Sequence, residues 1–485
     1  MSTHEARRAP PPSAPVVAIV GGGFSGVMVA AHLLREAVSP LRVVLIERRG
    51  ALGEGVAYST GEPEHLLNVP AKNMSAWPDR SEDFFRWAAK RDHTVGLDDF
   101  LPRRWYGDYI RDTLSVAARE ARSARLEIVS DELRRLIRKP DGGWLMHFEN
   151  APSLPIDAAV LATGHCAPAD PFGDAWRGSR ARFISDPWRD FALDLARGDE
   201  PVVVLGSGLT AVDAVLSMTT RERSAPITLV SPRGLAPQGH SWPLSTPLDL
   251  SGFVDVKLGD PNGLTALGLL RDLRRLAKTH VARGGNWRAV IDGLRPHTPA
   301  LWRALSVTER RRFIARVRPF WEIHRHRTAP HVHACLQDLI SQDRVRIVAG
   351  RVIAAAARDE EVMLTISDRK TRGAYAMNAG WVVNCTGPTP SNRPEANPAI
   401  GSLLLQGRLK PDALGIGVET SERGAALTSS GDEQPNLLVV GTLRKPAFWE
   451  CIAVPELRGH AARAARTLLG LPQLRSAETD HFPTT

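Results

Sequence analysis

Short hydrophobic runs alternate along this chain with longer segments in which apolar residues recur every three or four positions. The first run ends in a glycine-rich turn, AIVGGGFSG from Ala18 to Gly26, and is followed by an apolar helical segment, Val27 to Leu34, and a second run, Leu41 to Ile46. The same order recurs at Val202 to Leu205, Thr210 to Met218 and Ile227 to Val230. Apolar runs separated by helices are typical of buried parallel strands. The pattern predicts an α/β fold with two Rossmann-type units.

Other segments fill the space between and after these units. Apolar spacing predicts helices from Ser81 and from about Tyr106, a helical insertion from about 263 to 340, and a last helix that begins near Val454 to Glu456. Within the insertion, Ser306 and Glu309 form a capping box. Strands are predicted within Leu126 to Phe148 and at Ala158 to Gly164, Val345 to Val348, Arg351 to Ala357, Val362 to Ser367, Gly380 to Gly387 and Leu437 to Val440.

The first glycine-rich turn has the chemistry of a nucleotide-binding loop. Gly21, Gly23 and Gly26 have GxGxxG spacing, which allows a tight turn, close approach of the backbone to a pyrophosphate, and close packing of helix on strand. Glu47 ends the second strand, where an acid binds the two hydroxyls of an unphosphorylated adenosine ribose. The alternative is a tight turn between a strand and a helix without a ligand.

The second unit repeats this turn, but its following strand does not end in an acidic residue. Gly206, Gly208 and Ala211 give GxGxxA, and the following strand ends in Ser231 and Arg233. An acid at that position would repel a 2′-phosphate, whereas a serine and an arginine can bind one. The second unit is therefore predicted to favour NADPH over NADH, unless Arg233 is an ordinary surface residue.

Two further strands end in a Thr-Gly pair, Thr163-Gly164 and Thr386-Gly387. A small residue is needed where the backbone runs beside a cofactor. The two pairs bracket the second unit, which predicts an inserted domain: the first pair takes the chain out of the first domain and the second brings it back. The N-terminus of the last helix, near Val454, suits the pyrimidine end of a flavin, whose reduced form is anionic.

Composition excludes several classes of function. The net charge of +9 comes from scattered arginines without a Lys/Arg block, so nucleic-acid binding is not expected. The four cysteines are far apart, which predicts reduced thiols and no zinc site or redox pair. No segment has the composition of a membrane span, and a cytoplasmic location is expected. Residues 1–15 are predicted to be a disordered lead and 473–485 a flexible tail.

Candidate substrate-binding residues are fewer and less specific. The long segment from His65 to Asp79 includes Asn68 and Met74 and is typical of a functional loop. Arg103 and Arg104 stand at a helix entrance, either as anion ligands or as a solvated pair. Four histidines lie within Trp321 to His333, but the interleaved arginines disfavour a metal, so we expect these histidines to line a cleft. His65, His240, Arg103 and His326 are the candidate polar lining residues, each with an equally plain structural interpretation.

The chain resembles the bacterial family of FAD/NAD(P)-binding proteins within the two-dinucleotide-binding-domain flavoproteins. The resemblance rests on GGGFSG, GEGVAYST with HLLNVPAKNMSAWPD, FLPRRWYGDY, GSGLTAVD, SPRGLAPQGH, WEIHRHRTAP and WECIAVPELRGHA, which together run from about Val16 to Leu469. It implies FAD in the first Rossmann unit and a reduced nicotinamide in the second. Relatives with this layout include flavin monooxygenases, N-hydroxylating ones among them, and disulfide reductases.

Three departures from those relatives narrow the range of reactions that we expect. The chain lacks the cysteine pair of disulfide reductases. The monooxygenase linker is degenerate in FISDPW, Phe183 to Trp188, which keeps the aromatic residue and lacks the histidine. The Gly-Asp pair expected after the last flavin strand is Gly441-Thr442, so the acid that would bind the ribityl chain is missing. These departures weaken the case for oxygen insertion and leave flavin binding expected.

The sequence therefore predicts an FAD-dependent, NADPH-using oxidoreductase, foremost a monooxygenase on a small nucleophile such as an amine or thiol. The alternatives are an NADPH-dependent reductase or oxidase without oxygen insertion and a non-catalytic redox sensor. Expected domains are an FAD domain at 16–168 and 381–472 and an NADPH domain at 195–380. Catalytic residues, substrate and oligomeric state are not predicted, and no metal is expected. Predicted cofactor-binding residues are Gly21, Gly23, Phe24, Ser25, Gly26, Glu47, Arg48, Asn68, Met74, Thr163, Gly164, Gly206, Gly208, Leu209, Thr210, Ser231, Arg233, Thr386, Gly387, Gly441 and Val454.

Overall fold

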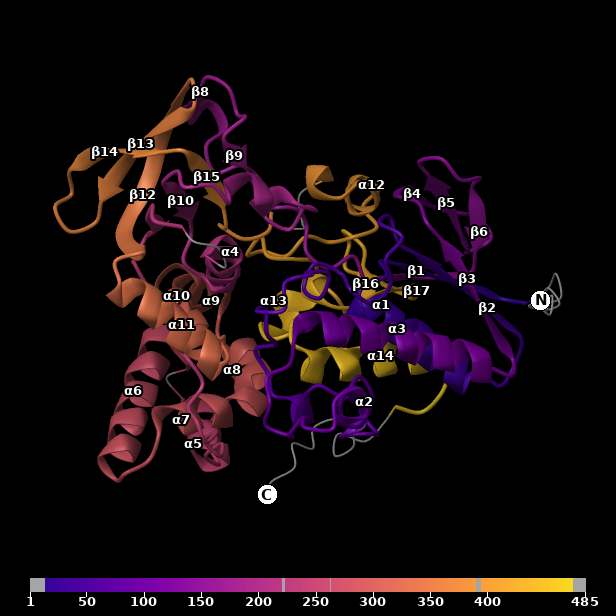
Figure 1. Ribbon diagram of the computed structural model, residues 1–485. Coiled ribbons are helices and arrows are strands. Elements are labelled where there is room, and N and C mark those ends of the chain that lie inside the picture. The colour runs from indigo at the N-terminus through magenta and orange to yellow at the C-terminus, as the bar shows by residue number, and fades with distance from the viewer. Residues whose placement is uncertain (1–13, 220–222, 262, 390–393, 474–485) are drawn as a thin grey trace.

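Two separate β-sheets with helices around them form the protein (Figure 1). The computed structural model describes residues 14–219, 223–261, 263–389 and 394–473. The predicted lead and tail therefore lie almost wholly outside the described residues. The α/β class and the parallel pairing inside both Rossmann units are confirmed.

The first sheet has six strands in the order β16-β17-β7-β1-β2-β3, and all except β16 run parallel. The strands are β1 (Val16–Val20), β2 (Leu41–Ile46), β3 (Ala124–Val129), β7 (Ala158–Leu161), β16 (Ala425–Leu427) and β17 (Glu433–Val439). Strand β17 comes from the C-terminal part of the chain and pairs with β7. The first domain is thus assembled from two distant segments of the sequence.

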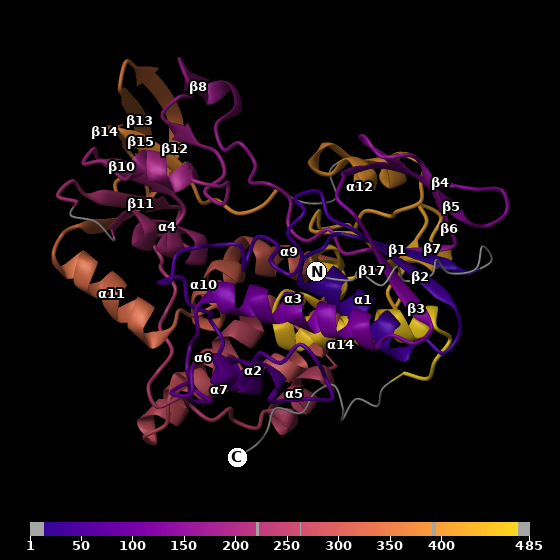
Figure 2. The ribbon, with the colours of Figure 1, turned by 45° about the vertical axis from the view of Figure 1, so that its right-hand side comes forward.

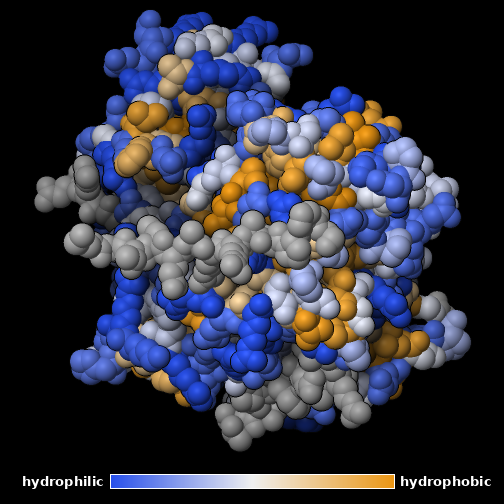
Figure 3. Space-filling model, turned by 90° about the vertical axis from the view of Figure 1, so that its right-hand side faces the viewer, coloured by the Kyte–Doolittle hydropathy of each residue, from blue (hydrophilic) through white to orange (hydrophobic). Residues whose placement is uncertain are grey.

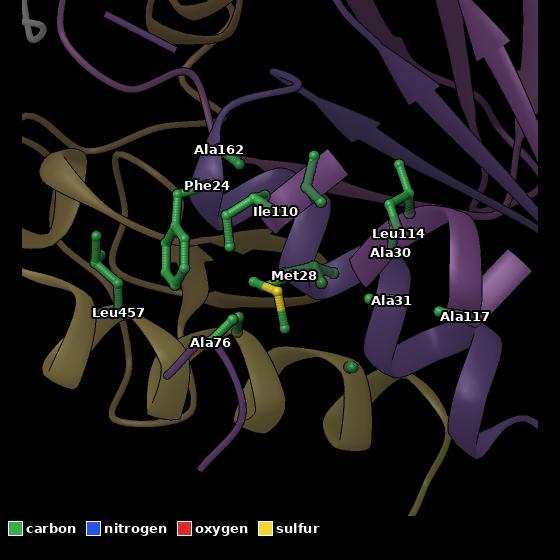
Figure 4. Close-up of a cluster of buried hydrophobic side chains, with 14 of the residues drawn as sticks. Phe24, Met28, Ala30, Ala31, Ala76, Ile110, Leu114, Ala117, Ala162 and Leu457 are labelled. Carbon is green, nitrogen blue, oxygen red and sulfur yellow. The ribbon is translucent and has the colours of Figure 1, made fainter. Parts of the chain in front are cut away.

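Helices cover one face of this sheet and a small antiparallel sheet covers the other (Figures 1 and 2). The helices are α1 (Phe24–Glu36), α3 (Arg103–Glu120) and α14 (Val454–Leu468), with α2 (Asp83–Arg91) beside α3. The opposite face carries β4 (Leu133–Arg138), β5 (Trp144–Phe148), β6 (Leu154–Ile156) and α12 (Pro398–Leu405). Figure 4 shows α1 between α3 and α14, with Phe24 and Met28 in the hydrophobic cluster that joins them. Burial of this apolar stripe fixes the start of α1 against the sheet.

The second sheet has eight strands in the order β14-β13-β12-β11-β10-β15-β9, with β8 paired to β12. They are β8 (Trp176–Arg177), β9 (Phe183–Ile184), β10 (Val202–Leu205), β11 (Ile227–Ser231), β12 (Val345–Arg358), β13 (Glu361–Asp368), β14 (Ala374–Ala379) and β15 (Trp381–Asn384). Helices α4 (Leu209–Thr219) and α11 (Pro330–Ser341) pack on one face. The two strands predicted at 345–357 are one continuous strand, and β14 was not predicted.

A group of helices extends from the second domain between β11 and β12. It comprises α5 (Ser251–Leu258), α6 (Ala266–Ala282), α7 (Trp287–Gly293), α8 (Thr298–Ala304), α9 (Val307–Arg312) and α10 (Arg318–Arg325). Leu273, Val290 and Leu301 belong to its own core. Trp302 reaches the first domain, because it stacks near Trp449, just after α13 (Lys445–Phe448), with ring centroids 4.8 Å apart. Half of the predicted capping box forms: the Glu309 backbone N–H donates to Oγ of Ser306, whereas the Glu309 carboxylate accepts from the backbone N–H of Ala266.

The predicted domain boundaries need three corrections. The second domain does not begin at 195, because β8 and β9 already pair with its strands β12 and β15. It does not end at 380, because β15 lies between β10 and β9 in its sheet. The helical insertion begins with α5 at Ser251 rather than near 263 and ends with α10, since α11 packs in the core of the second sheet. The helix expected from Tyr106 begins at Arg103.

Two sets of contacts join the domains. At the connection, the backbone of 167–168 runs antiparallel to that of 388–389, and the Thr389 N–H donates to the Ala167 carbonyl at 3.0 Å. At a second place, Arg103 at the start of α3 forms a buried ion pair with Asp213 on α4. On the face that Figure 3 shows, hydrophobic residues form patches separated by hydrophilic ones. Among the described residues, no helix is long and apolar enough to cross a membrane.

Candidate functional site

The turn between β1 and α1 is a cradle that side chains would fill. Gly21 has φ +110°, and a Cβ there would lie 2.4 Å from the Ala162 carbonyl oxygen. A Cβ on Gly26 would lie 1.8 Å from the Gly21 carbonyl oxygen. No side chain caps the N-terminus of α1 at Gly23, so the backbone N–H groups of its first turn are available for an anion. These residues fit the diphosphate of a dinucleotide.

Glu47 stands at the end of β2, beside this turn. Its carboxylate accepts hydrogen bonds from the backbone N–H of Gly22 at 2.8 Å and of Arg49 at 3.0 Å. These bonds fix the carboxylate and leave acceptor capacity for ribose hydroxyls. Across the turn, the buried hydroxyl of Thr163 has no hydrogen-bond partner among the described residues. The donor set here fits the adenosine half of FAD.

The turn between β10 and α4 repeats the geometry of the first. Gly206 also has φ +110°, and a Cβ there would lie 2.5 Å from the Cys385 carbonyl oxygen. A Cβ on Gly208 would meet nothing within 4 Å, so this turn opens to space beside the helix N-terminus. Thr386 and Gly387 therefore lie beside the second nucleotide turn, as Thr163 and Gly164 lie beside the first. Each Thr-Gly pair follows the strand next to the first strand of its own unit.

The end of β11 brings together the residues predicted to select NADPH. Ser231 is buried, and its hydroxyl accepts a bond from Oγ of Ser207 at 2.7 Å. The Arg233 guanidinium lies 5.1 Å from the centre of the Phe320 ring, and Arg369 donates to the Pro232 carbonyl at 3.3 Å. Arg369 was not predicted, because it comes from the turn after β13, far away in the sequence. Two guanidinium groups thus lie beside one loop.

A cavity of about 1450 Å³ lies between the two domains. The first domain contributes Arg48, Asn68, Met74 and Val454, and the second contributes Leu209, Thr210 and Gly387. The helical insertion closes another side with Asp292, Arg295, Arg325, His326 and Arg327. The segment from Pro243 to Ser251 completes the wall. One cavity therefore reaches Arg48, which follows Glu47 at the end of β2, the start of α4 and the start of α14.

The start of α14 lies at the edge of this cavity. Ile452, Ala453 and Val454 line it, and no side chain caps the helix N-terminus. Gly441, after β17, has φ +88° and lies near Ser25, since a Cβ on Gly441 would be 3.4 Å from Oγ of Ser25. Thr442, in place of the expected acid, donates from Oγ1 to the Gly164 carbonyl at 2.7 Å. These residues fit the pyrimidine end of a flavin, with the α14 N-terminus facing it.

Two of the four predicted polar lining residues, Arg103 and His65, bind groups of the second domain, and of these two only Arg103 lines the cavity. Arg103 donates from both terminal nitrogens to Asp213, at 2.8 and 3.1 Å, and from Nε to the Leu66 carbonyl, so its guanidinium is not free for an anion; Arg104 is exposed. His65 is buried away from the cavity, within 3.0 Å of the Asp213 carbonyl and of the Ser217 hydroxyl. The interpretation of Arg103 as an anion ligand is therefore wrong.

His240 and His326 do line the cavity. Burial, with repulsion from Arg327, lowers the pKa of His240 to about 4. Burial also lowers the pKa of His326 to about 4, although Glu450 opposes the shift. His240 donates from Nε2 to the Asn68 carbonyl at 3.1 Å and so fixes the functional loop of the first domain. Both imidazoles are uncharged at neutral pH.

The remaining predicted residues divide into backbone and side-chain positions. The Phe24 ring points into the core (Figure 4), which leaves only its backbone for a cofactor. Leu209 and Thr210 begin α4 at the second turn. In the His-rich segment only His326 reaches the cavity wall, and His331 is exposed. No group of His, Cys, Asp or Glu among the described residues could hold a metal ion.

Sequence reasoning missed several residues of the wall. Asp292, Arg295, Arg325 and Arg327 face the cavity from α7, from α10 and from the segments that follow them. The repeated His-Arg pattern of residues 324–327 was the available signal, and it was interpreted through its histidines. Arg295 forms a two-pronged ion pair with Glu456 on α14, at 2.5 and 2.8 Å. The insertion is thereby tied to the helix that begins at the cavity.

A family model described as FAD-NAD(P)-binding matches residues 18–166, which span β1 to β7 of the first domain. A search of curated proteins found no match to the chain. Three solved structures are similar over almost the whole length. They are the reduced form of ornithine hydroxylase from Pseudomonas aeruginosa (TM-score 0.61, 15% identity, 94% of this chain and 99% of that one), an ornithine N-hydroxylase from Kutzneria sp. 744 (0.60, 14%, 94% and 99%) and an FAD-bound cadaverine monooxygenase from Erwinia amylovora (0.59, 13%, 97% and 99%).

Proposed function

We propose that this protein, whose fold is that of the two-dinucleotide-binding-domain flavoproteins, is an FAD-dependent, NADPH-using oxidoreductase. Its foremost activity is that of a monooxygenase on a small nucleophilic substrate. One observation carries the proposal: a single cavity is lined by Arg48, next to Glu47 of the first unit, by the start of α4 in the second unit and by the uncapped start of α14. A nicotinamide on the second turn and a flavin ring at α14 would meet in that space.

Within this arrangement the residues bind and orient the cofactors. The α1 turn and Glu47 hold the FAD diphosphate and ribose, and the α4 turn with Ser231 and Arg233 holds NADPH. The bound flavin supplies electron transfer from NADPH to oxygen. In the hydroxylation of an amine, one oxygen atom enters the N–H bond, the other leaves as water, and NADPH with one proton supplies the two electrons.

The names of the similar structures support this choice of reaction. All three are described as hydroxylases or monooxygenases, two of them of ornithine and one of cadaverine, and one was solved with reduced FAD, NADP⁺ and L-ornithine. Those substrates are small amines. A small amine also fits beside His240 and His326, because neither of these uncharged imidazoles repels an ammonium group.

A disulfide reductase is disfavoured by the state of the cysteines. Cys166 and Cys385 line the cavity, but all four cysteines are free thiols. Burial raises the pKa of both of these thiols, whereas a redox-active pair needs a thiolate. Four reduced thiols favour a cytoplasmic location for the enzyme. The alternative that remains is an NADPH-dependent reductase or oxidase without oxygen insertion.

Anaerobic titration of the FAD-loaded protein with NADPH, followed by oxygen, tests the proposal. We expect the flavin absorbance to bleach quickly with NADPH and slowly with NADH, and hydroxylated product to appear when oxygen and a suitable amine are added. Reoxidation without oxygenated product would favour the reductase or oxidase. A protein that cannot be loaded with FAD would overturn the assignment, and a flavin that never bleaches would leave a binding protein.

The cofactor preference gives a sharper test at Arg233. The substitution Arg233→Gln removes a guanidinium that we expect to contact the 2′-phosphate, so the NADPH concentration for half-maximal bleaching should rise roughly tenfold. The value for NADH should stay unchanged. Arg346→Gln is the matched control, because Arg346 pairs with Asp343 at the opposite end of the same sheet. Equal losses for both cofactors would contradict the role of Arg233.

A further inference from the structure

The end of α10 and the residues after it carry two buried arginines that the proposed cofactor sites do not use. Arg325, His326 and Arg327 follow one another in the cavity wall, across from the start of α14. The side chain of Arg325 is 9% exposed and that of Arg327 is 3% exposed. Neither of the two proposed nucleotide-binding sites includes Arg325 or Arg327. These two guanidinium groups therefore need an explanation of their own.

Arg327 is incompletely satisfied. Its Nη2 donates to both carboxylate oxygens of Asp292, at 2.6 and 2.8 Å. Its Nε and Nη1 are buried and have no hydrogen-bond partner among the described residues. A buried donor without an acceptor costs free energy, and a guanidinium presents five N–H groups in one plane. Arg327 thus keeps two nitrogens, Nε and Nη1, whose N–H groups no acceptor of the described residues uses.

Arg325 is in a similar state. Its Nη2 lies 3.6 Å from Oε2 of Glu450, which is close enough for an ion pair and too long for a hydrogen bond. Its Nε and Nη2 also have no hydrogen-bond partner among the described residues. The other oxygen of Glu450 accepts a bond from the Trp321 indole at 2.8 Å. The acid near Arg325 is therefore directed elsewhere, and the guanidinium keeps unused donors.

We propose that the substrate of this site carries a carboxylate and that Arg327, with Arg325 beside it, binds that carboxylate. The proposal rests on the proposed function, because it names the substrate class of the same cavity. The phosphates of NADPH are a second source of anionic oxygens. They are expected at Gly206, Gly208, Ser231 and Arg233, on the turn and the strand end of the second sheet, whereas Arg325 ends α10 and Arg327 follows it. The carboxylate of an organic substrate is the occupant that fits.

Matched pairs of amines test the inference. L-ornithine and putrescine share a carbon skeleton and differ in the carboxylate, as do 4-aminobutyrate and propylamine. We would titrate each compound into the FAD-loaded protein, and record the flavin difference spectrum and the shift of the thermal unfolding midpoint. The carboxylated member of at least one pair should bind roughly tenfold more tightly, because a two-pronged arginine contact recognises it.

Variants assign the effect to the two arginines. Arg327→Gln and Arg325→Gln should each remove the difference within the pair, and Arg327→Lys should keep part of it. Arg274→Gln, on the exposed face of α6, removes the same charge away from the cavity and should change nothing. If Arg327→Gln does not fold, as judged by its circular dichroism, the lysine variant and Arg325→Gln carry the test.

Equal affinity within both pairs, including no detectable binding of any member, would overturn the inference. So would variants in which the NADPH concentration for half-maximal bleaching rises instead, since the arginines would then bind the dinucleotide. Failure of the proposed function looks different: carboxylated amines would bind and raise the unfolding midpoint, while NADPH would leave the flavin oxidised.

Discussion

Gly23 shows how one residue can serve a ligand without being required by the fold. A Cβ at this position would lie 3.5 Å from Cα of Gly55, which is ordinary contact, and φ is −74°. Gly23→Ala should therefore fold normally, yet its methyl group would stand between the backbone and the diphosphate. We expect FAD affinity to fall by roughly tenfold or more. Retained flavin after gel filtration measures the loss.

Gly61→Ala is the control for that experiment, since a Cβ on Gly61 would meet nothing within 4 Å. It should keep both fold and flavin. Full flavin retention by Gly23→Ala would show that the diphosphate does not approach this backbone.

The two uncharged histidines make stability depend on pH. Their folded-state pKa of about 4 lies below the ordinary value of 6.5. Between these values the unfolded chain binds more protons than the folded protein, so stability falls as pH drops from about 6.5 to 4. The loss from pH 7 to pH 5 should be roughly 1 to 2 kcal/mol for each histidine.

Urea unfolding of wild type and His326→Gln at pH 7 and pH 5 measures this effect. The variant should lose less stability than wild type over the same interval, because one of the histidines with a lowered pKa is gone. His147→Gln, at the small β4-β5-β6 sheet, is a control that should leave the pH dependence unchanged. An unchanged slope in His326→Gln would contradict the lowered pKa.

For single residues, the sequence could predict those roles that depend only on neighbouring positions in the chain. Gly21 and Gly206 have the same backbone angle because each makes the same turn from strand to helix. Arg327 could not be assigned, because its partner Asp292 lies on α7 and its unused donors depend on how α10 meets the first domain. Such a role follows from packing and not from spacing.

At the scale of elements, the contact of α3 with α4 is expected to contribute strongly to stability. Arg103 and Asp213 are nearly buried, so removing one partner leaves the other charge without compensation. Asp213→Asn or Arg103→Gln should each destabilise the protein by about 3 to 5 kcal/mol. The double variant Arg103→Met/Asp213→Leu should recover most of that loss.

Urea unfolding of the two single variants and the double variant, treated as a double-mutant cycle, measures the coupling. Additive losses would show that the pair is not coupled. From the sequence, the arginines at the start of α3 could be interpreted as anion ligands or as a solvated pair, because nothing local distinguishes an arginine that binds a ligand from one that binds another helix. The partner lies in the other domain.

The whole molecule is held at two places, the backbone connection at 167–168 with 388–389 and the Arg103–Asp213 pair. Arg295 and Glu456 add a third contact, from the insertion to α14. Two domains fixed in this way should not rotate when a nucleotide binds. Small-angle scattering with and without NADP⁺ should give radii of gyration that agree within about 1 Å. A larger change would indicate that the domains reorient.

The alternation of strands and helices was enough to predict two nucleotide-binding units and their order. It was not enough to place the boundaries, because β8, β9 and β15 are short or apolar strands that suit either sheet, and only pairing decides between them. The residues of the cavity wall could not be predicted, because many of them come from the helical insertion. Its helices could be predicted one by one, but their position against the two domains could not.

The place where the chain leaves the first domain is also the place where it returns. Ala167 and Thr389 are hydrogen-bonded neighbours, so the chain between them leaves and re-enters the first domain at one pair of adjacent backbone segments. The domain proposed to bind the nicotinamide is therefore inserted into a loop of the domain proposed to bind the flavin. A different domain inserted at the same two segments would give the flavin a new electron donor. The first sheet would keep all of its strands.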